Sequence, residues 1–230
     1  MDFNRCYKCF KPMKACRCAD ITPVDTGVRF IFLMHPKEAY KQKTGTGRLT
    51  SLSLADSEII VGIDFTNNAR VNELISGANG AEGYGEGKDA FPVILYPASD
   101  AYFTDSPEFR TAIGHKKLIV IVVDATWFFA RKMINLSVNL HGIPKLSFRK
   151  EYRSRFEFKK QPSPECLSTI ESTYYLAQEL KEAGIVKPEA DLSCLMTAFR
   201  NMVEYQLACE QARHVAMARE QYPELFEGQA

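Results

Sequence analysis

The feature that most constrains the fold is a set of short, almost uninterrupted apolar segments rich in valine and isoleucine. They cover Val28–Met34, Ile59–Val61, Val93–Leu95 and Leu118–Val123. Strands that are apolar on both faces are typical of a parallel sheet covered on both sides. Helical patterns alternate with them, most clearly at Thr126–Leu136, Thr169–Ala183 and Leu192–Val215. The alternation predicts an α/β fold, a parallel sheet flanked by helices.

No segment fits a membrane. The longest apolar run, residues 118–123, is far too short to cross a bilayer, and the first ten residues lack the apolar core of a signal peptide. We therefore expect a cytoplasmic protein without a membrane partner.

The charges are unevenly distributed although the net charge is only +1. Residues 1–50 contain ten lysines and arginines against four acidic residues, whereas residues 161–230 contain five against eleven. This asymmetry indicates a polyanionic partner on one face, or scattered charges that only solvate the surface.

Four of the seven cysteines lie within the first eighteen residues, as Cys6-x2-Cys9-x6-Cys16-x-Cys18. In a cytosolic chain such a cluster indicates a metal site before disulfides, and four thiolates complete a closed, structural zinc site. Iron, or reduced cysteines without a metal, are the alternatives. We expect two parts, a zinc-binding knuckle in residues 1–25 and one larger domain in residues 26–230.

Polar clusters follow the ends of three apolar segments, where ligands bind in open α/β sheets. His35 follows the first segment, Tyr96 and Pro97 the third, and Asp124-Ala125-Thr126-Trp127 the fourth. A further cluster, Leu167 to Glu171, opens a helix with a capping-box pattern of Ser168 or Thr169 with Glu171.

Each cluster also has a purely structural interpretation. Asp124 could cap the helix that follows it, Trp127 could belong to the core, and Glu171 could serve only as a cap. The chain has no G-x-S-x-G, H-E-x-x-H or G-x-G-x-x-G motif, so no motif supports a hydrolase, a zinc protease or a Rossmann dehydrogenase.

Taken in order, these motifs resemble the DTW-domain family of tRNA-uridine aminocarboxypropyltransferases, named for an Asp-x-Thr-Trp motif. The resemblance covers roughly residues 5–210. Besides the cysteines it includes His35-Pro36-Lys37-Glu38, Thr46-Gly47-Arg48-Leu49, Tyr96-Pro97, Asp124 to Trp127, Ala130-Arg131-Lys132-Met133 and Ser168-Thr169-Ile170-Glu171. Ala98-Ser99-Asp100 and the glycine-rich loop at 76–88 depart from the family pattern.

The resemblance implies a SPOUT-like sheet with a C-terminal trefoil knot, and S-adenosylmethionine as the cofactor. The implied reaction transfers the 3-amino-3-carboxypropyl group to N3 of a tRNA uridine, in the variable loop in bacterial members, and releases methylthioadenosine. We expect tRNA and not DNA as the partner. The alternatives are methyl transfer to RNA from the same cofactor and a non-catalytic zinc-containing RNA-binding protein. The sequence does not predict the oligomeric state.

The resemblance also implies roles for residues. Asp124, Thr126 and Trp127 would be catalytic. Cofactor contacts would come from Tyr96, Pro97, Asp124, Thr126, Leu167, Ser168, Thr169 and Glu171. Asp124 could take the N3 proton or hold the cofactor's ammonium group, and Trp127 could pack on the adenine or on a flipped uridine.

Basic residues give the candidate RNA contacts. Arg48, Arg131 and Lys132 could bind the cofactor carboxylate or an RNA phosphate. Residues 145–160 alternate basic and aromatic side chains, including Arg149, Lys150, Arg153 and Arg155. That pattern suits phosphate contact with base stacking, and an amphipathic surface segment is the alternative.

Overall fold

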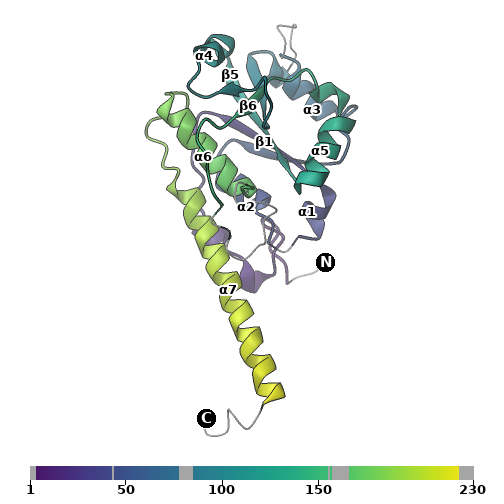
Figure 1. Ribbon diagram of the computed structural model, residues 1–230, viewed down its shortest axis with the longest axis vertical. Coiled ribbons are helices and arrows are strands. Elements are labelled where there is room, and N and C mark those ends of the chain that lie inside the picture. Colours follow the sequence, from purple (N-terminus) through teal and green to yellow (C-terminus); the bar gives the residue numbers. More distant parts are fainter. Residues whose placement is uncertain (1–3, 43, 78–84, 155, 157–165, 223–230) are drawn as a thin grey trace.

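The computed structural model describes residues 4–42, 44–77, 85–154, 156 and 166–222. Six parallel strands form one sheet in the order β2-β1-β5-β3-β6-β4 (Figure 1). The strands are β1 (Arg29–Met34), β2 (Ser57–Val61), β3 (Ala90–Leu95), β4 (Tyr102–Phe103), β5 (Lys117–Asp124) and β6 (Lys145–Ser147).

Helices connect these strands and cover the sheet. They are α1 (Pro36–Tyr40), α2 (Gly47–Leu52), α3 (Ala69–Ile75), α4 (Pro107–Ile113), α5 (Trp127–Leu136), α6 (Thr169–Glu182) and α7 (Ser193–Gln221). Among the described residues, no helix is long and apolar enough to cross a membrane.

The central strands are apolar throughout because each face of the sheet has its own core. Phe30 and Val120 point to a core shared with α2, α4, α6 and α7, whereas Ile31 and Ile121 point to a core shared with α3 and α5. Figure 1 shows α6 and α7 on one side of the sheet and α3 and α5 on the other. The expected α/β fold with helices on both faces is confirmed.

The structure differs from the sequence-based expectation at the two shortest strands and at the longest helix. β4 and β6 have two and three residues, too few for a period-two pattern to mark. α7 has 29 residues and continues six residues past the expected end at Val215. The described residues do not show the expected knot, and residues 157–165, between β6 and α6, lie outside the described part.

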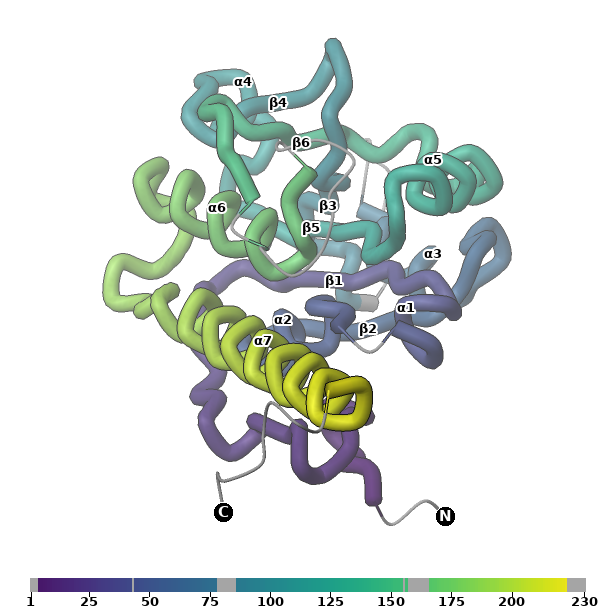
Figure 2. The backbone as a smooth tube through the Cα atoms, turned by 60° about the horizontal axis from the view of Figure 1, so that its bottom comes forward, coloured from purple at the N-terminus to yellow at the C-terminus, as the bar shows by residue number. Residues whose placement is uncertain are grey.

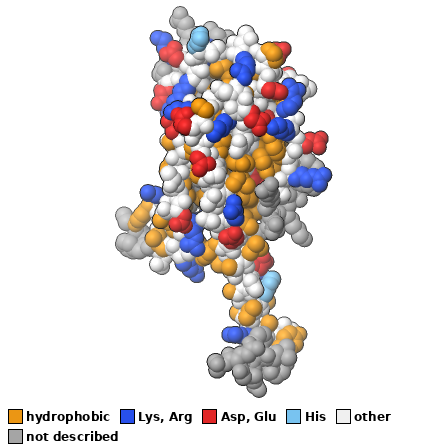
Figure 3. All heavy atoms as spheres, turned by 90° about the vertical axis from the view of Figure 1, so that its left-hand side faces the viewer, with side chains coloured by type: hydrophobic (Ala, Val, Ile, Leu, Met, Phe, Trp, Pro, Cys, Tyr) orange, Lys and Arg blue, Asp and Glu red, His pale blue; other side chains and the backbone are white. Residues whose placement is uncertain are grey.

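The outer half of α7 leaves the body of the protein. The buried residues of this helix end at Val203. Leu207, four residues beyond Val203, is 39% exposed. Figure 3 shows the outer half of the helix standing clear of the body.

The cysteine segment packs beside the first half of α7. Two short 3-10 turns, Met13–Ala15 and Cys18–Asp20, shape it. The Arg17 guanidinium lies 5.1 Å from the centre of the Tyr205 ring of α7. Figure 2 shows this N-terminal segment alongside α7, and Arg48 of α2 lies over the Phe10 ring of the segment.

A buried acid of α6, Glu179, fixes the chain after β6. Its carboxylate accepts hydrogen bonds from the Tyr152 hydroxyl at 2.9 Å and the Thr104 hydroxyl at 3.1 Å. The backbone amides of Arg149 and Lys150 also donate to it, both at 3.4 Å. Four donors directed at one buried carboxylate make Glu179 a structural residue.

We expect Glu179→Ala to lower the free energy of unfolding by about 1–3 kcal/mol, because its donors lose their acceptor inside the protein. Glu182→Ala on the same helix is the control, since Glu182 makes only an exposed pair with Lys150. Its effect should stay within about 0.5 kcal/mol. Urea denaturation of the two variants gives the comparison, and equal losses would contradict the structural role.

Candidate active site and metal centre

The candidate site is built around Asp124, the last residue of the central strand β5. Its side chain is almost fully buried, and Oδ1 accepts a hydrogen bond of 2.5 Å from the hydroxyl of Thr169, the first residue of α6. Its backbone carbonyl accepts one of 3.0 Å from the amide of His35, which follows β1. The end of β1, the end of β5 and the start of α6 therefore meet at this residue.

Gly47 lets α2 approach Asp124 closely. A Cβ atom at Gly47 would lie 2.0 Å from Asp124 Oδ2 and 2.8 Å from Met34 Cε. Neither contact is sterically allowed, so only glycine fits at the start of α2. The threonine-glycine motif at Thr46-Gly47 thus has a direct physical reason.

The helix-cap interpretation does not describe the Asp124 side chain well. The N-cap of α5 is Thr126, whereas the Asp124 carboxylate reaches across 45 residues of sequence to Thr169. Glu171 differs, because it forms the predicted capping box with Ser168. Glu171 is fully buried and also accepts hydrogen bonds from the Ser154 hydroxyl at 2.9 and 3.2 Å.

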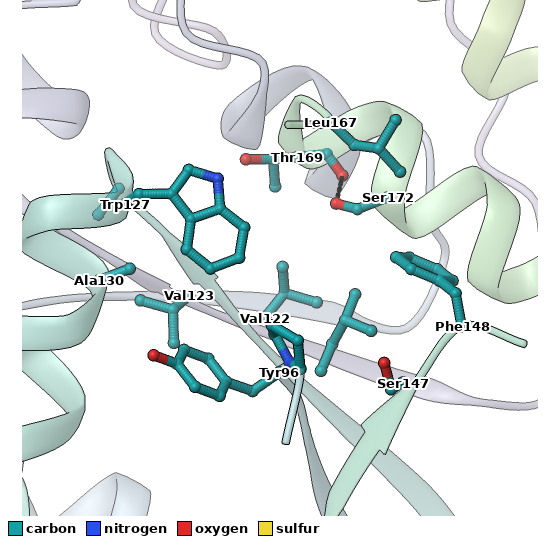
Figure 4. A pocket seen from close by; sticks show the side chains of 13 residues that line it. Tyr96, Val122, Val123, Trp127, Ala130, Ser147, Phe148, Leu167, Thr169 and Ser172 are labelled. Atoms are coloured by element: carbon teal, nitrogen blue, oxygen red, sulfur yellow. Dashed lines mark hydrogen bonds between the residues drawn. The ribbon is translucent and has the colours of Figure 1, made fainter. Parts of the chain in front are cut away.

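A cavity of about 330 Å³, here called the first cavity, opens at the ends of β3 and β5. Figure 4 shows Trp127 and Tyr96 on one side of it, and Leu167, Ser172 and Phe148 on the other. The ring centres of Tyr96 and Trp127 are 6.3 Å apart, and Trp127 is 42% exposed, so it is a cavity wall rather than a core residue. Mixed apolar and aromatic lining with a few hydroxyls suits a small organic ligand.

A second cavity of about 200 Å³ adjoins the first, and the two share Trp127, Leu167 and Thr169 as lining residues. The second cavity adds Asp124 and Glu38. The residues predicted for catalysis and cofactor binding that line one or both cavities are Tyr96, Pro97, Asp124, Thr126, Trp127, Leu167, Ser168 and Thr169. Glu171 lines neither.

Sequence reasoning gave no role to Glu38 and Ser172, which line these cavities, and it placed Phe148 in the candidate RNA segment at 145–160 rather than at a cavity. Glu38 had a signal in the His35-Pro36-Lys37-Glu38 motif. His35 itself is structural: it caps α1, where Nδ1 accepts from the Lys37 amide at 3.1 Å, and its ring stacks on Phe129 with centres 4.4 Å apart. Burial lowers the pKa of His35, and so do the charges of Lys37 and Lys132, which favours the neutral ring.

A larger hollow of about 640 Å³, here called the basic groove, extends from Asp124 to the cysteine segment. Its acidic lining residues are Glu38 and Asp124. Its basic lining residues are Arg5, Lys11, Lys14, Lys41 and Arg48. Arg48 and two lysines of the cysteine segment, Lys11 and Lys14, are predicted RNA contacts that line this groove, whereas Arg131 and Lys132 are exposed on α5.

The predicted RNA-binding segment at 145–160 is partly engaged with the protein itself. Arg149 pairs with Asp105 at 3.1 Å and Lys150 with Glu182 at 2.7 Å, whereas Arg153 is exposed. Tyr152 stacks on Tyr175 of α6 with ring centres 4.0 Å apart. Arg155 lies outside the described residues.

The four cysteines of the N-terminal segment form a candidate metal centre. The sulfur atoms of Cys6, Cys9, Cys16 and Cys18 all lie within 4.8 Å of one another, and those of Cys6 and Cys18 are 3.8 Å apart. Tetrahedral zinc with Zn–S bonds of about 2.3 Å requires sulfurs about 3.8 Å apart. The geometry therefore fits a closed, four-thiolate zinc site.

The pKa values of the cysteine thiols are shifted in different directions. A hydrogen bond from the Cys9 backbone lowers the pKa of Cys6 to about 6, whereas burial raises the pKa of Cys9 and of Cys18. Four crowded thiolates need a cation to balance their charge, and a bound metal provides it.

Comparison with known proteins defines the class. The model of the DTW domain matches residues 3–207, so the chain belongs to the DTW domain family. A Drosophila melanogaster protein named tRNA-uridine aminocarboxypropyltransferase 2 is 25% identical over 228 residues, which are 96% of this chain and 83% of the relative. Proteins of the same name from Mus musculus and Macaca fascicularis are 25% and 23% identical over 72% of this chain.

The chain spans 53% of the length of the two mammalian relatives. No solved structure matches the chain closely enough to add to this comparison.

We expect the purified protein to carry one zinc ion per chain. Cys9→Ser should abolish metal retention, because a closed site needs all four thiolates. Cys209→Ser is the matched control, since Cys209 is exposed in the nearby groove but outside the cluster. Metal analysis by mass spectrometry measures both. Less than about half an equivalent of zinc in the unmodified protein, with no iron, would contradict the zinc site.

We expect Gly47→Ala to destabilise the fold by about 1–3 kcal/mol, because the new methyl group must displace the Asp124 carboxylate or Met34. In Gly45→Ala the nearest atom is the flexible Gln42 Cγ at 3.3 Å, so this neighbouring variant is the control. Thermal denaturation distinguishes them. A Gly47→Ala protein as stable as Gly45→Ala would show that α2 can move away from Asp124.

Proposed function

We propose that this protein transfers the 3-amino-3-carboxypropyl group of S-adenosylmethionine to N3 of a uridine in tRNA, in the variable loop, and releases methylthioadenosine. The observation that carries the proposal is the Asp124 carboxylate, which lines both the second cavity and the basic groove. Membership of the DTW family and the names of its relatives support the reaction class.

The first cavity is the proposed site of the adenosyl group. Tyr96, Trp127 and Phe148 offer apolar ring surfaces, and the hydroxyls of Thr169 and Ser172 offer polar contacts. Pro97 and Leu167 complete the contact with the cofactor, whereas Glu171 holds the start of α6 rather than the cofactor. When bound, S-adenosylmethionine supplies an electrophilic carbon beside its sulfonium.

Asp124 is the proposed general base. Uridine N3 is a poor nucleophile while protonated, so the carboxylate takes that proton as the N3–carbon bond forms. The bound S-adenosylmethionine would supply the leaving group, since its carbon–sulfur electron pair would stay on sulfur in neutral methylthioadenosine. Thr169 orients the carboxylate through its hydrogen bond, and Thr126 and Trp127 line the adjoining space where the uridine base would lie.

The proposal also includes a division of the chain into two parts and a set of tRNA contacts. Residues 1–25 would form a separate zinc knuckle, and residues 26–230 a catalytic domain with the SPOUT-type knot. Arg131, Lys132, Arg149, Lys150, Arg153 and Arg155 would contact tRNA away from the cavities. Arg149 pairs with Asp105 and Lys150 with Glu182, so both would have to leave these carboxylates to bind a tRNA phosphate.

We expect Asp124→Asn to reduce the transfer rate about a hundredfold or more, the effect of losing a general base. Asparagine is close to aspartate in size and can still accept the Thr169 hydrogen bond, so the variant should fold. The control is Asp89→Asn. Asp89 is exposed and directly precedes β3, at the amino-terminal end of the strands and therefore at the end opposite Asp124. Mass spectrometry of nucleosides from tRNA incubated with S-adenosylmethionine measures the rate.

The same experiment separates the alternatives. A uridine heavier by a methyl group would make the protein an RNA methyltransferase, and no modified nucleoside would favour a non-catalytic RNA-binding protein. Loss of cofactor binding together with transfer in Asp124→Asn would make Asp124 an anchor for the cofactor ammonium group. Near-normal transfer by this variant would remove the proposed base.

A further inference from the structure

Phe10, in the cysteine segment, has an unusual backbone conformation. Its φ is 59°, in the left-handed region, and among the described residues it is the one non-glycine residue with a positive φ. A bulky side chain in this region is disfavoured, and such conformations concentrate at functional sites. We therefore expect a contact of the Phe10 ring that compensates for this disfavoured conformation.

The turn itself explains the conformation but not the side chain. The Phe10 amide donates to the Cys6 carbonyl at 2.9 Å and the Cys6 amide donates to the Lys11 carbonyl at 2.8 Å. This tight turn brings Cys6 and Cys9 together, and glycine would adopt it without strain. The Phe10 ring is 47% exposed, so burial in a core does not explain it either.

The ring has a specific partner in the catalytic domain. The Arg48 guanidinium lies 4.2 Å from the centre of the Phe10 ring, and both residues line the basic groove. Arg48 Nε is buried and makes no hydrogen bond within the described part of the chain. Its Nη2 donates to the Ala39 carbonyl at 3.5 Å, so the guanidinium is held at the groove wall beside the Phe10 ring.

The surroundings favour nucleic acid as the ligand of this groove. The groove combines five basic residues with Phe10 and with Tyr40, which is 67% exposed. Basic side chains that follow a backbone, with aromatic rings for stacking, are typical of sites for unpaired nucleotides. Arg48 lines neither the first nor the second cavity, so a phosphate suits it better than the carboxylate of the cofactor.

We propose that Phe10, Arg48 and Tyr40 form a clamp for an unpaired tRNA nucleotide next to the acceptor uridine. Arg48 binds its phosphate, and the two aromatic rings stack on its base. This inference rests on the proposed function, in which the acceptor reaches Asp124 from the basic groove. It gives the cysteine segment a role in holding RNA, through the ring that follows its second cysteine.

The decisive experiment uses Phe10→Gly in the full-length protein and an unmodified tRNA transcript. Glycine removes the ring and also relieves the backbone strain. We expect the variant to keep its metal and to unfold at the same or a higher temperature, while its dissociation constant for tRNA rises roughly tenfold. Its affinity for S-adenosylmethionine should not change.

Two further variants sharpen the result. Tyr7→Ala is the matched control, because Tyr7 is 73% exposed in the same segment but does not line the groove, and it should leave the affinity unchanged. Arg48→Gln should reduce the slope of log affinity against log salt by about one, the effect of one lost phosphate contact.

The inference is overturned if Phe10→Gly binds tRNA within about twofold of the unchanged protein, or if it loses metal and stability, which would make the ring structural. Failure of the proposed function gives a different result. In that case the unchanged protein yields no aminocarboxypropyl uridine, whatever the Phe10 variant does to tRNA affinity.

Discussion

The central strand β5 is covered by apolar side chains on both faces, so a charged residue can follow only where the strand leaves the sheet. Asp124 occupies that position, yet it is still almost completely buried. A buried carboxylate is tolerated only when hydrogen bonds or cations compensate for lost water. The Thr169 hydroxyl supplies one such bond, and Gly47 leaves room for the carboxylate. The start of α6 and the start of α2 are therefore both positioned by the same acid.

Local patterns in the sequence were enough to predict the parts of this arrangement. The two-sided burial of β1, β3 and β5, the capping box of Ser168 with Glu171, and the four-cysteine cluster all follow from spacing over a few residues. The contacts between those parts were not predictable, because Asp124 and Thr169 are 45 residues apart and no periodicity links them. The left-handed conformation of Phe10 was not predictable either, because such a conformation is usually marked by glycine and the sequence has phenylalanine there.

Several polar residues among the candidates from the sequence make contacts that stabilise the fold. His35 caps α1 and stacks on Phe129, and Glu171 joins the start of α6 to Ser154. Eight residues further along the same helix, Glu179 holds the chain after β6 by the same means. α6 thus contributes Thr169 to the site and two buried acids to the segment that leads towards it. Whether a polar residue of α6 faces the cavities or stabilises the fold depends on its surroundings and not on its residue type.

The two cavities and the basic groove form a row that shares lining residues from one hollow to the next. The row begins with apolar rings and ends with arginine and lysine side chains, with Asp124 between them. A small ligand and a large polyanion that occupy opposite ends of such a row need not pass each other. Under the proposed function this layout permits random-order kinetics, in which either substrate loads first and the spent nucleoside departs while the RNA is still held.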